Sequence, residues 1–252
     1  MSESARAAAR ERLAKLLGGL GLEPSPPSPC PYLPGRDSRL VALRPKRLTP
    51  ALYELFLELN FRRLQDLVYR PECDGCRECR QLRVDVRGFR PSRSQRRCLK
   101  KNADVVAETG PPSPSEEKHR LYRRYLAARH DGQMDGSLRE FVEFLHEAPP
   151  FTEEVVFRAA GRILGIGIFD ATPQALSAVY FYFDPEQEAR SPGTFNVLWL
   201  IDEARRRALP WLYLGYHVAG SRQMAYKAGF GPNQRLEDGG GFRSLARGVA
   251  VE

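Results

Sequence analysis

The segments EVVFRAA (Glu154–Ala160) and RILGIGIF (Arg162–Phe169), joined by Gly161, decide the fold. Both are short and rich in Val, Ile and Phe, which is the pattern of two strands joined by a tight turn. AVYFYF (Ala178–Phe183) is a third strand of the same kind. Helix, strand and helix patterns then follow at Gly193–Arg207, Trp211–Leu214 and Ser221–Ala228. This order predicts an α+β fold with a mixed sheet.

The rest of the chain contains further helix and strand patterns. Apolar spacing predicts helices at Met1–Leu22, Pro50–Asn60, Glu116–Arg129 and Ser137–Glu147, and strands at Leu40–Leu43 and Leu82–Val86. The segment GPPSPS (Gly110–Ser115) is the clearest break. We therefore expect an N-terminal domain at residues 1–109 and a second domain at residues 110–252.

The composition is that of a globular protein with an anionic partner. The chain has 252 residues, a formal net charge of +8 and a pI near 9.4. Such a charge favours RNA, DNA or a membrane surface as the partner. No run approaches the ~20 apolar residues that span a bilayer. The Arg-rich start is similar to a mitochondrial presequence, but Glu3 and Glu11 argue against that interpretation. We expect a docking helix in a cytoplasmic protein.

Four of the five cysteines are candidate metal ligands. Cys73, Cys76 and Cys79 form two overlapping C-x2-C pairs, and Cys30 is the obvious fourth thiol. Four thiolates would suit either zinc or an iron–sulfur cluster, and the spacing does not separate the two. The alternative is a set of reduced, partly buried thiols without a metal.

A basic run follows the cysteines. The segment Arg87–Lys101 contains seven basic residues and no acidic residue. Ser92, Ser94 and Gln95 add neutral donors between the arginines, and Phe89 offers a ring for stacking. A solvated charged face is the alternative, but this mixture favours nucleic-acid binding.

The order of elements in the second half resembles the acetyltransferase-like fold known as GNAT. In that fold a separated pair of central strands receives the acyl donor, and small residues at a helix start meet the pyrophosphate of coenzyme A. The corresponding run here is Arg190-Ser-Pro-Gly193-Thr-Phe195, with Phe195 in place of a small residue. The resemblance therefore implies a GNAT-like domain whose donor is not coenzyme A.

Both halves together resemble the aminoacyl-tRNA protein transferases, and the bacterial leucyl branch more closely than the eukaryotic arginyl branch. The motifs that carry this resemblance span about Cys30 to Pro232 and include CPYLPGR (30–36), FRR (61–63), YRP (69–71), the three clustered cysteines, FRPSRSQRR (89–97), LYRRY (121–125), LSAVY (176–180), FDP (183–185), YLGY (213–216) and MAYK (224–227). The resemblance implies transfer of leucine from leucyl-tRNA to proteins that begin with Asp or Glu, which creates a degradation signal. It implies no cofactor for the transfer itself.

The resemblance also suggests roles for individual residues. Tyr180 and Asp184, at the end of the third strand, are the candidates for orienting the attacking amine; the alternatives are that Tyr180 is a core residue and Asp184 a turn residue before Pro185. A cation is needed for an acidic acceptor, and the candidates for substrate binding are Arg62, Arg63, Arg83 and Tyr216. The candidates for tRNA binding are Arg93, Arg96, Arg97, Lys100, Lys101 and Lys227.

Several positions differ from the family pattern. The usual Gly-Phe-Arg-Arg-Ser-Gly is Asn60-Phe-Arg-Arg-Leu-Gln65 here, and the usual Gly-Tyr-Trp-Ile is Gly215-Tyr-His-Val218. These changes bear on the identity of the transferred amino acid. The alternatives are an arginyl-tRNA protein transferase, a GNAT-type N-acetyltransferase and a non-catalytic RNA-binding protein.

Overall fold

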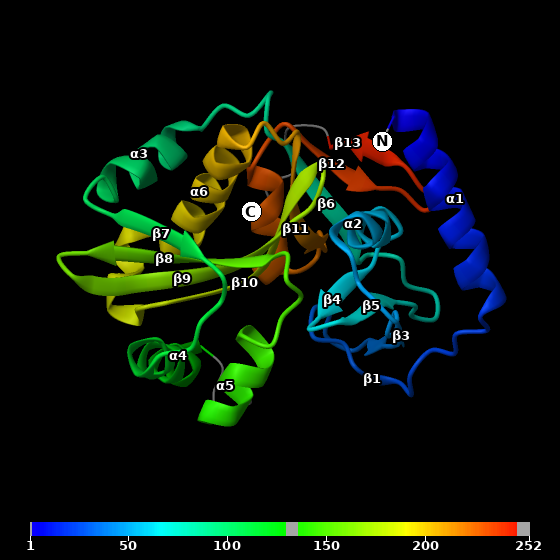
Figure 1. Cartoon of the computed structure of the whole chain (residues 1–252), viewed down its shortest axis with the longest axis horizontal. Helices are drawn as coiled ribbons and strands as arrows, with labels where there is room; N and C mark the ends of the chain where they lie inside the picture. The colour runs from blue at the N-terminus through cyan, green and yellow to red at the C-terminus, as the bar shows by residue number, and fades with distance from the viewer. Residues whose placement is uncertain (1, 130–135, 246–252) are drawn as a thin grey trace.

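The computed structural model describes residues 2–129 and 136–245, and an eight-stranded mixed sheet lies at its centre (Figure 1). The strand order is β13-β12-β6-β11-β10-β9-β8-β7. All neighbours are antiparallel except β10 and β11, which are parallel. The strands are β6 (Arg80–Asp85), β7 (Val106–Gly110), β8 (Thr152–Ala159), β9 (Arg162–Ala171), β10 (Ala175–Phe183), β11 (Trp211–His217), β12 (Asn233–Leu236) and β13 (Phe242–Ser244).

Helices cover both faces of strands β7 to β10. Figure 1 shows α3 and α6 on one side of these strands and α4 and α5 on the other. Val155 and Phe157 of β8 pack in the core under α6, while Val156 packs in the core under α4 and α5. This alternation explains why the strands are apolar at nearly every position. The helices are α3 (Arg93–Lys101), α4 (Glu116–Arg129), α5 (Leu138–Leu145) and α6 (Pro192–Arg206), and η1 (Pro185–Arg190) precedes α6.

The N-terminal region forms a third core beside β11. A three-stranded sheet of order β3-β5-β4 packs with α1 and α2 there, on the right in Figure 1. Tyr53 and Phe56 of α2 share this core with Tyr213 of β11. Its elements are α1 (Glu3–Gly19), β1 (Ser28–Pro29), β2 (Asp37–Ser38), β3 (Leu40–Leu43), α2 (Pro50–Glu58), β4 (Arg62–Leu64) and β5 (Leu67–Pro71).

The α+β fold class with a mixed sheet is confirmed, and the sequence missed two kinds of element. One kind is the short strands β1, β2, β4, β5, β7, β12 and β13. The other is α3, because the basic run was interpreted only as a charged segment. The C-terminal helix pattern is a short α7 (Arg222–Ala225) followed by the 3-10 helix η2 (Tyr226–Gly229).

The two predicted domains contribute to the same sheet. β6 belongs to residues 1–109 and lies between β11 and β12, which belong to residues 110–252. The predicted boundary falls at the end of β7, the edge strand on the opposite side. The division into two domains stays a prediction. Among the described residues, no helix has both the length and the apolar character to cross a membrane.

Candidate active site

Strands β10 and β11 are paired only at their first residues. Ala175–Ser177 pairs with Trp211–Tyr213. Further along, β10 stays with β9 as far as Phe183, and β11 stays with β6 as far as His217. Each strand has an irregular register just after the shared pairs. The two strands therefore separate toward their carboxyl ends, as the acyl-receiving pair of the resembled fold does.

The side chain of Arg62 lies between the separating strands. Arg62 is at the start of β4, and its Nη2 donates a hydrogen bond to the carbonyl of Ala178 in β10 over 2.8 Å. On the other side a Cβ atom at Gly215 of β11 would be only 2.7 Å from Nη1. Gly215 has a φ of +78°, a conformation that favours glycine. Glycine at this position thus gives the guanidinium room to enter.

Lys227 approaches the same part of β11. Its Nζ donates to the carbonyl of Tyr216 over 2.6 Å and contacts Sδ of Met224 at 3.5 Å. The residue is 8% exposed. Burial lowers the pKa of Lys227 to about 7; the nearby Arg62 lowers it as well, while Cys79 opposes the shift. The sequence predicted a tRNA contact for Lys227, but the structure places it inside the protein, next to Arg62.

Tyr216 links these two cations to the N-terminal region. Its hydroxyl donates to the carbonyl of Asn60 over 2.9 Å and is 3.3 Å from the carbonyl of Tyr69. Burial raises the pKa of this hydroxyl well above its usual value. Tyr216 therefore holds β11 against β5 and against the residues just before β4.

Arg63 and Arg83, the other predicted substrate cations, are occupied by contacts within the protein. Arg63 is buried and forms an ion pair with Asp170, whose carboxylate also accepts a bond of 2.7 Å from Thr152. The guanidinium of Arg83 lies between two aromatic rings, 3.8 Å from the centroid of Trp211 and 3.9 Å from that of Phe242. These contacts hold the core together, so only Arg62 of the three lies between the strands.

Tyr180 and Asp184 lie on β10 and just after it, away from Arg62. The hydroxyl of Tyr180 is buried without a hydrogen-bond partner among the described residues, in an aromatic cluster with Tyr122 and Phe144. Burial raises the pKa of Tyr180. Asp184 caps η1 and accepts a hydrogen bond from Arg124. The structure does not bring these two side chains together with Arg62 and Lys227.

Helix α3 carries five exposed basic residues and is fixed at both ends. Ser92 and Gln95 form a capping box at its start. Gln95 also donates over 3.1 Å to the carbonyl of Gly229, which ends η2, the turn that contains Lys227. Lys101, at the other end, donates to Ala189 over 2.8 Å. The exposed residues are Arg93, Arg96, Arg97, Lys100 and Lys101. The basic surface is therefore connected directly to the candidate site.

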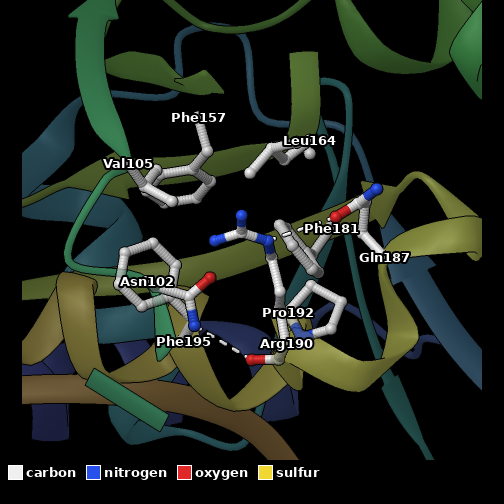
Figure 2. Close-up of a pocket in the computed structure, with 10 residues that line it drawn as sticks. Asn102, Val105, Phe157, Leu164, Phe181, Gln187, Arg190, Pro192 and Phe195 are labelled. Atoms are coloured by element: carbon white, nitrogen blue, oxygen red, sulfur yellow. Dashed lines mark hydrogen bonds between the residues drawn. The ribbon is translucent and has the colours of Figure 1, made fainter. Parts of the chain in front are cut away.

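A small hollow opens beside the start of α6, next to the end of α3. Its volume is about 260 Å³, including space open to solvent. Figure 2 shows the Arg190 side chain pointing into it among the rings of Phe157, Phe181 and Phe195. Arg190 is held by a two-bond ion pair with Asp104, at 2.7 and 2.9 Å. Phe195, the departure from the coenzyme A motif, thus fills the space beneath the helix start.

Comparison with known proteins defines the family. A model described as the N terminus of arginine-tRNA-protein transferase matches residues 28–97, and the model of its C terminus matches residues 117–237. A protein of Methylobacterium sp. (strain 4-46) named aspartate/glutamate leucyltransferase is 42% identical over 224 residues, which is 83% of this chain and 90% of that protein. The chain belongs to the aspartate/glutamate leucyltransferase family. A relative of the same name from Thiobacillus denitrificans is 42% identical, with 83% of this chain and 89% of that protein covered.

Solved structures similar to this leucyltransferase family member are more distant. FemX covers 70% of this chain, and 63% of FemX is matched, at 9% identity and a TM-score of 0.42. L-PGS from Bacillus licheniformis covers 66% of this chain, and 50% of it is matched, at 12% identity and a TM-score of 0.42. Both scores are low, so the fold assignment depends on the sheet described above.

The predicted metal site at the cysteines of this family member finds no support in the described part of the chain. Among the described residues, no group of three or more His, Cys, Asp or Glu is arranged to hold a metal ion. Sγ of Cys73 accepts from the backbone N–H of Arg39 at 3.4 Å, while Sγ of Cys76 accepts from Arg36 at 3.5 Å. Burial raises the pKa of Cys79 to about 12, and the neighbouring thiols of Cys30, Cys73 and Cys76 act in the same direction. The zinc or iron–sulfur interpretation of Cys30, Cys73, Cys76 and Cys79 is therefore unsupported.

Proposed function

We propose that this protein transfers the leucyl group of leucyl-tRNA to the α-amine of proteins that begin with Asp or Glu. The observation that carries the proposal is the 42% identity, over 83% of this chain, to a relative named aspartate/glutamate leucyltransferase. The same comparison covers 90% of that relative, so the similarity extends over nearly the whole enzyme.

The reaction is the aminolysis of an ester. The nitrogen of the neutral α-amine attacks the ester carbonyl carbon, a C–N bond forms, and the C–O bond to the ribose breaks. One proton leaves the amine and one is gained by the ribose oxygen, so the products are a peptide bond and free tRNA. Because the ester is already activated, the rate depends on positioning the two ends and on stabilising the carbonyl oxygen.

The separated strands support this donor over acetyl-coenzyme A. Arg62 occupies the space between β10 and β11, in contact with Ala178 on one strand and Gly215 on the other. A pantetheine chain laid between the strands would collide with this guanidinium. An aminoacyl ester brings only its short acyl end to the strands, because the rest of the donor is held outside on its phosphates.

Helix α3 is the proposed surface for tRNA. Its exposed cations can meet successive phosphates, and guanidinium groups suit phosphate oxygens well. The bond from Gln95 to Gly229 connects this helix with η2, so a tRNA on α3 lies beside the candidate site. A tRNA donor and protein acceptors also favour the cytoplasm as the location of the reaction, and the product is a protein marked for degradation.

The proposal is tested with purified protein, labelled aminoacyl-tRNA and peptides that differ only in the first residue. Label from leucyl-tRNA is expected on peptides that begin with Asp or Glu, and less from arginyl-tRNA or phenylalanyl-tRNA. Preference for arginyl-tRNA would make the protein an arginyl transferase. Equal binding of charged and uncharged tRNA without transfer would leave only an RNA-binding role, and acetylation by acetyl-coenzyme A would indicate an acetyltransferase.

A further inference from the structure

Two other buried cations of the described structure have carboxylate partners. Arg63 is paired with Asp170, and Lys118 is paired with Glu154. All four side chains are almost fully buried. Such pairing is the usual condition for burying a charge, since an isolated buried ion loses its hydration without compensation.

Arg62 and Lys227 differ from these two. Within residues 2–129 and 136–245, neither forms an ion pair with a carboxylate. Asp170 acts on Arg62 electrostatically, but its oxygen atoms are already bonded to Arg63 and Thr152. Nη1 of Arg62 is buried without a hydrogen-bond partner in the described structure. Both cations therefore lack a counter-charge among the described residues.

The two cations meet at consecutive residues of β11. Arg62 packs over Gly215, and Lys227 bonds to the carbonyl of Tyr216. The lowered pKa of Lys227, with burial as its largest cause and Arg62 as the next, agrees with a site that lacks an anion. Unpartnered, mutually repelling charges are unfavourable for folding, so a functional reason for keeping them is expected.

Each cation has a donor left for a ligand. Lysine has three N–H donors, and two of those of Lys227 are directed to Tyr216 and Met224. Arg62 uses Nη2 for Ala178 and leaves Nη1 free. A carboxylate has two oxygen atoms, so it could accept one bond from each cation. Arg62 is partly exposed and lies where β10 and β11 separate, so we expect the ligand to enter between these strands.

The degree of burial of the two cations indicates which anion of the reaction they bind, a phosphate of the tRNA or a carboxylate of the acceptor. Phosphates of an RNA backbone are bulky and stay hydrated, and the exposed cations of α3 suit them. Arg62 and Lys227 lie deeper, where a small planar carboxylate can replace water completely. Charge-assisted bonds in such a place are strong, and a neutral amide could not satisfy both cations.

We propose that Arg62 and Lys227 together bind the side-chain carboxylate of the acceptor's N-terminal Asp or Glu. This inference rests on the proposed function, because it takes the acceptor to begin with an acidic residue. It assigns Lys227, which the sequence predicted to bind tRNA, to the acceptor subsite instead. It also explains how the enzyme distinguishes Asp from Asn, since the amide brings no negative charge.

The test uses the full chain and four peptides that differ only in beginning with Asp, Asn, Glu or Gln. Peptide binding is measured by calorimetry without tRNA, and kcat/KM is measured with leucyl-tRNA. Lys227→Met keeps the side-chain bulk and removes the charge. It is expected to weaken binding and lower kcat/KM of the Asp and Glu peptides by about tenfold or more, and those of the amide peptides by less than about threefold. The affinity for leucyl-tRNA should not change.

Lys46→Met is the matched control, because Lys46 is exposed and the same charge is removed outside the site. It should alter none of these values. Arg62→Lys, which keeps a charge but loses the planar fork, is the second variant and should also weaken Asp binding more than Asn binding. Equal losses for all four peptides, or weaker leucyl-tRNA binding with unchanged peptide binding, would overturn the subsite. If no peptide accepts leucine from the wild-type protein, the proposed function fails, whereas the calorimetric preference for Asp over Asn still decides the subsite.

Discussion

Gly215→Ala tests whether the space over β11 is reserved for Arg62. The added methyl group would be 2.7 Å from Nη1, 2.9 Å from Cζ and 3.4 Å from Nε of Arg62. Alanine at a φ of +78° costs about 1–2 kcal/mol by itself. Displacing a packed side chain adds roughly 1–3 kcal/mol. We therefore expect a loss of about 2–5 kcal/mol in the free energy of unfolding, together with loss of acceptor preference.

A double-mutant cycle separates the two contributions. In an Arg62→Ala background the collision is gone, so Gly215→Ala should cost only the conformational part, about 1–2 kcal/mol. Unfolding in urea gives the four free energies, and transfer to the Asp and Asn peptides gives the functional effect. Strict additivity, or a stable Gly215→Ala protein with unchanged preference for Asp, would refute the placement of Arg62 between the strands.

Three other perturbations have expected outcomes. Asp170→Asn leaves Arg63 buried without a negatively charged partner and should lower the free energy of unfolding in urea by about 3–5 kcal/mol, whereas Arg139→Ala breaks an exposed pair and should cost less than about 1 kcal/mol. Between pH 7 and the ordinary pKa of lysine, Lys227 binds fewer protons in the folded than in the unfolded state, so the free energy of unfolding of the wild type should rise with pH relative to that of Lys227→Met. If the free energies of unfolding of the two proteins, measured in urea, change with pH in parallel, the burial of an unpaired lysine beside Arg62 and Cys79 is contradicted. Arg97→Ala should weaken charged and uncharged tRNA equally and reduce the slope of log K against log salt by about 0.7–1, and an unchanged slope would exclude a phosphate contact.

Local patterns in the sequence predicted the main strands well. The hairpin at Gly161 and the strand after it form three consecutive strands of the sheet, β8, β9 and β10, and their apolar residues suit strands that are covered on both faces. Helix α3 was missed even though Ser92 and Gln95 have capping-box spacing. That signal was present, but the charge of the segment drew the interpretation toward binding alone.

The site could be predicted only in part, because its contacts are distant in sequence. The motif with Arg62 and Arg63 suggested two equivalent cations. Strand alternation sends the first between β10 and β11 and the second to Asp170, 107 residues away. Nothing local distinguishes these two destinations. Lys227 likewise lies in a pattern typical of an exposed helix end. Its burial and its hydrogen bond to the carbonyl of Tyr216 are seen only in the structure.

The two halves of the chain depend on each other at the site. β6 completes the sheet between β11 and β12, β4 supplies Arg62, and α3 is bonded to the turn that carries Lys227. Without the N-terminal half, both β11 and β12 would have a free edge, and the space between β10 and β11 would lose its cation. A tRNA held on α3 and an acceptor held between the strands are therefore positioned by one connected set of contacts. Transfer requires the two substrates to meet in a fixed geometry, and this connection is the physical means by which the fold provides it.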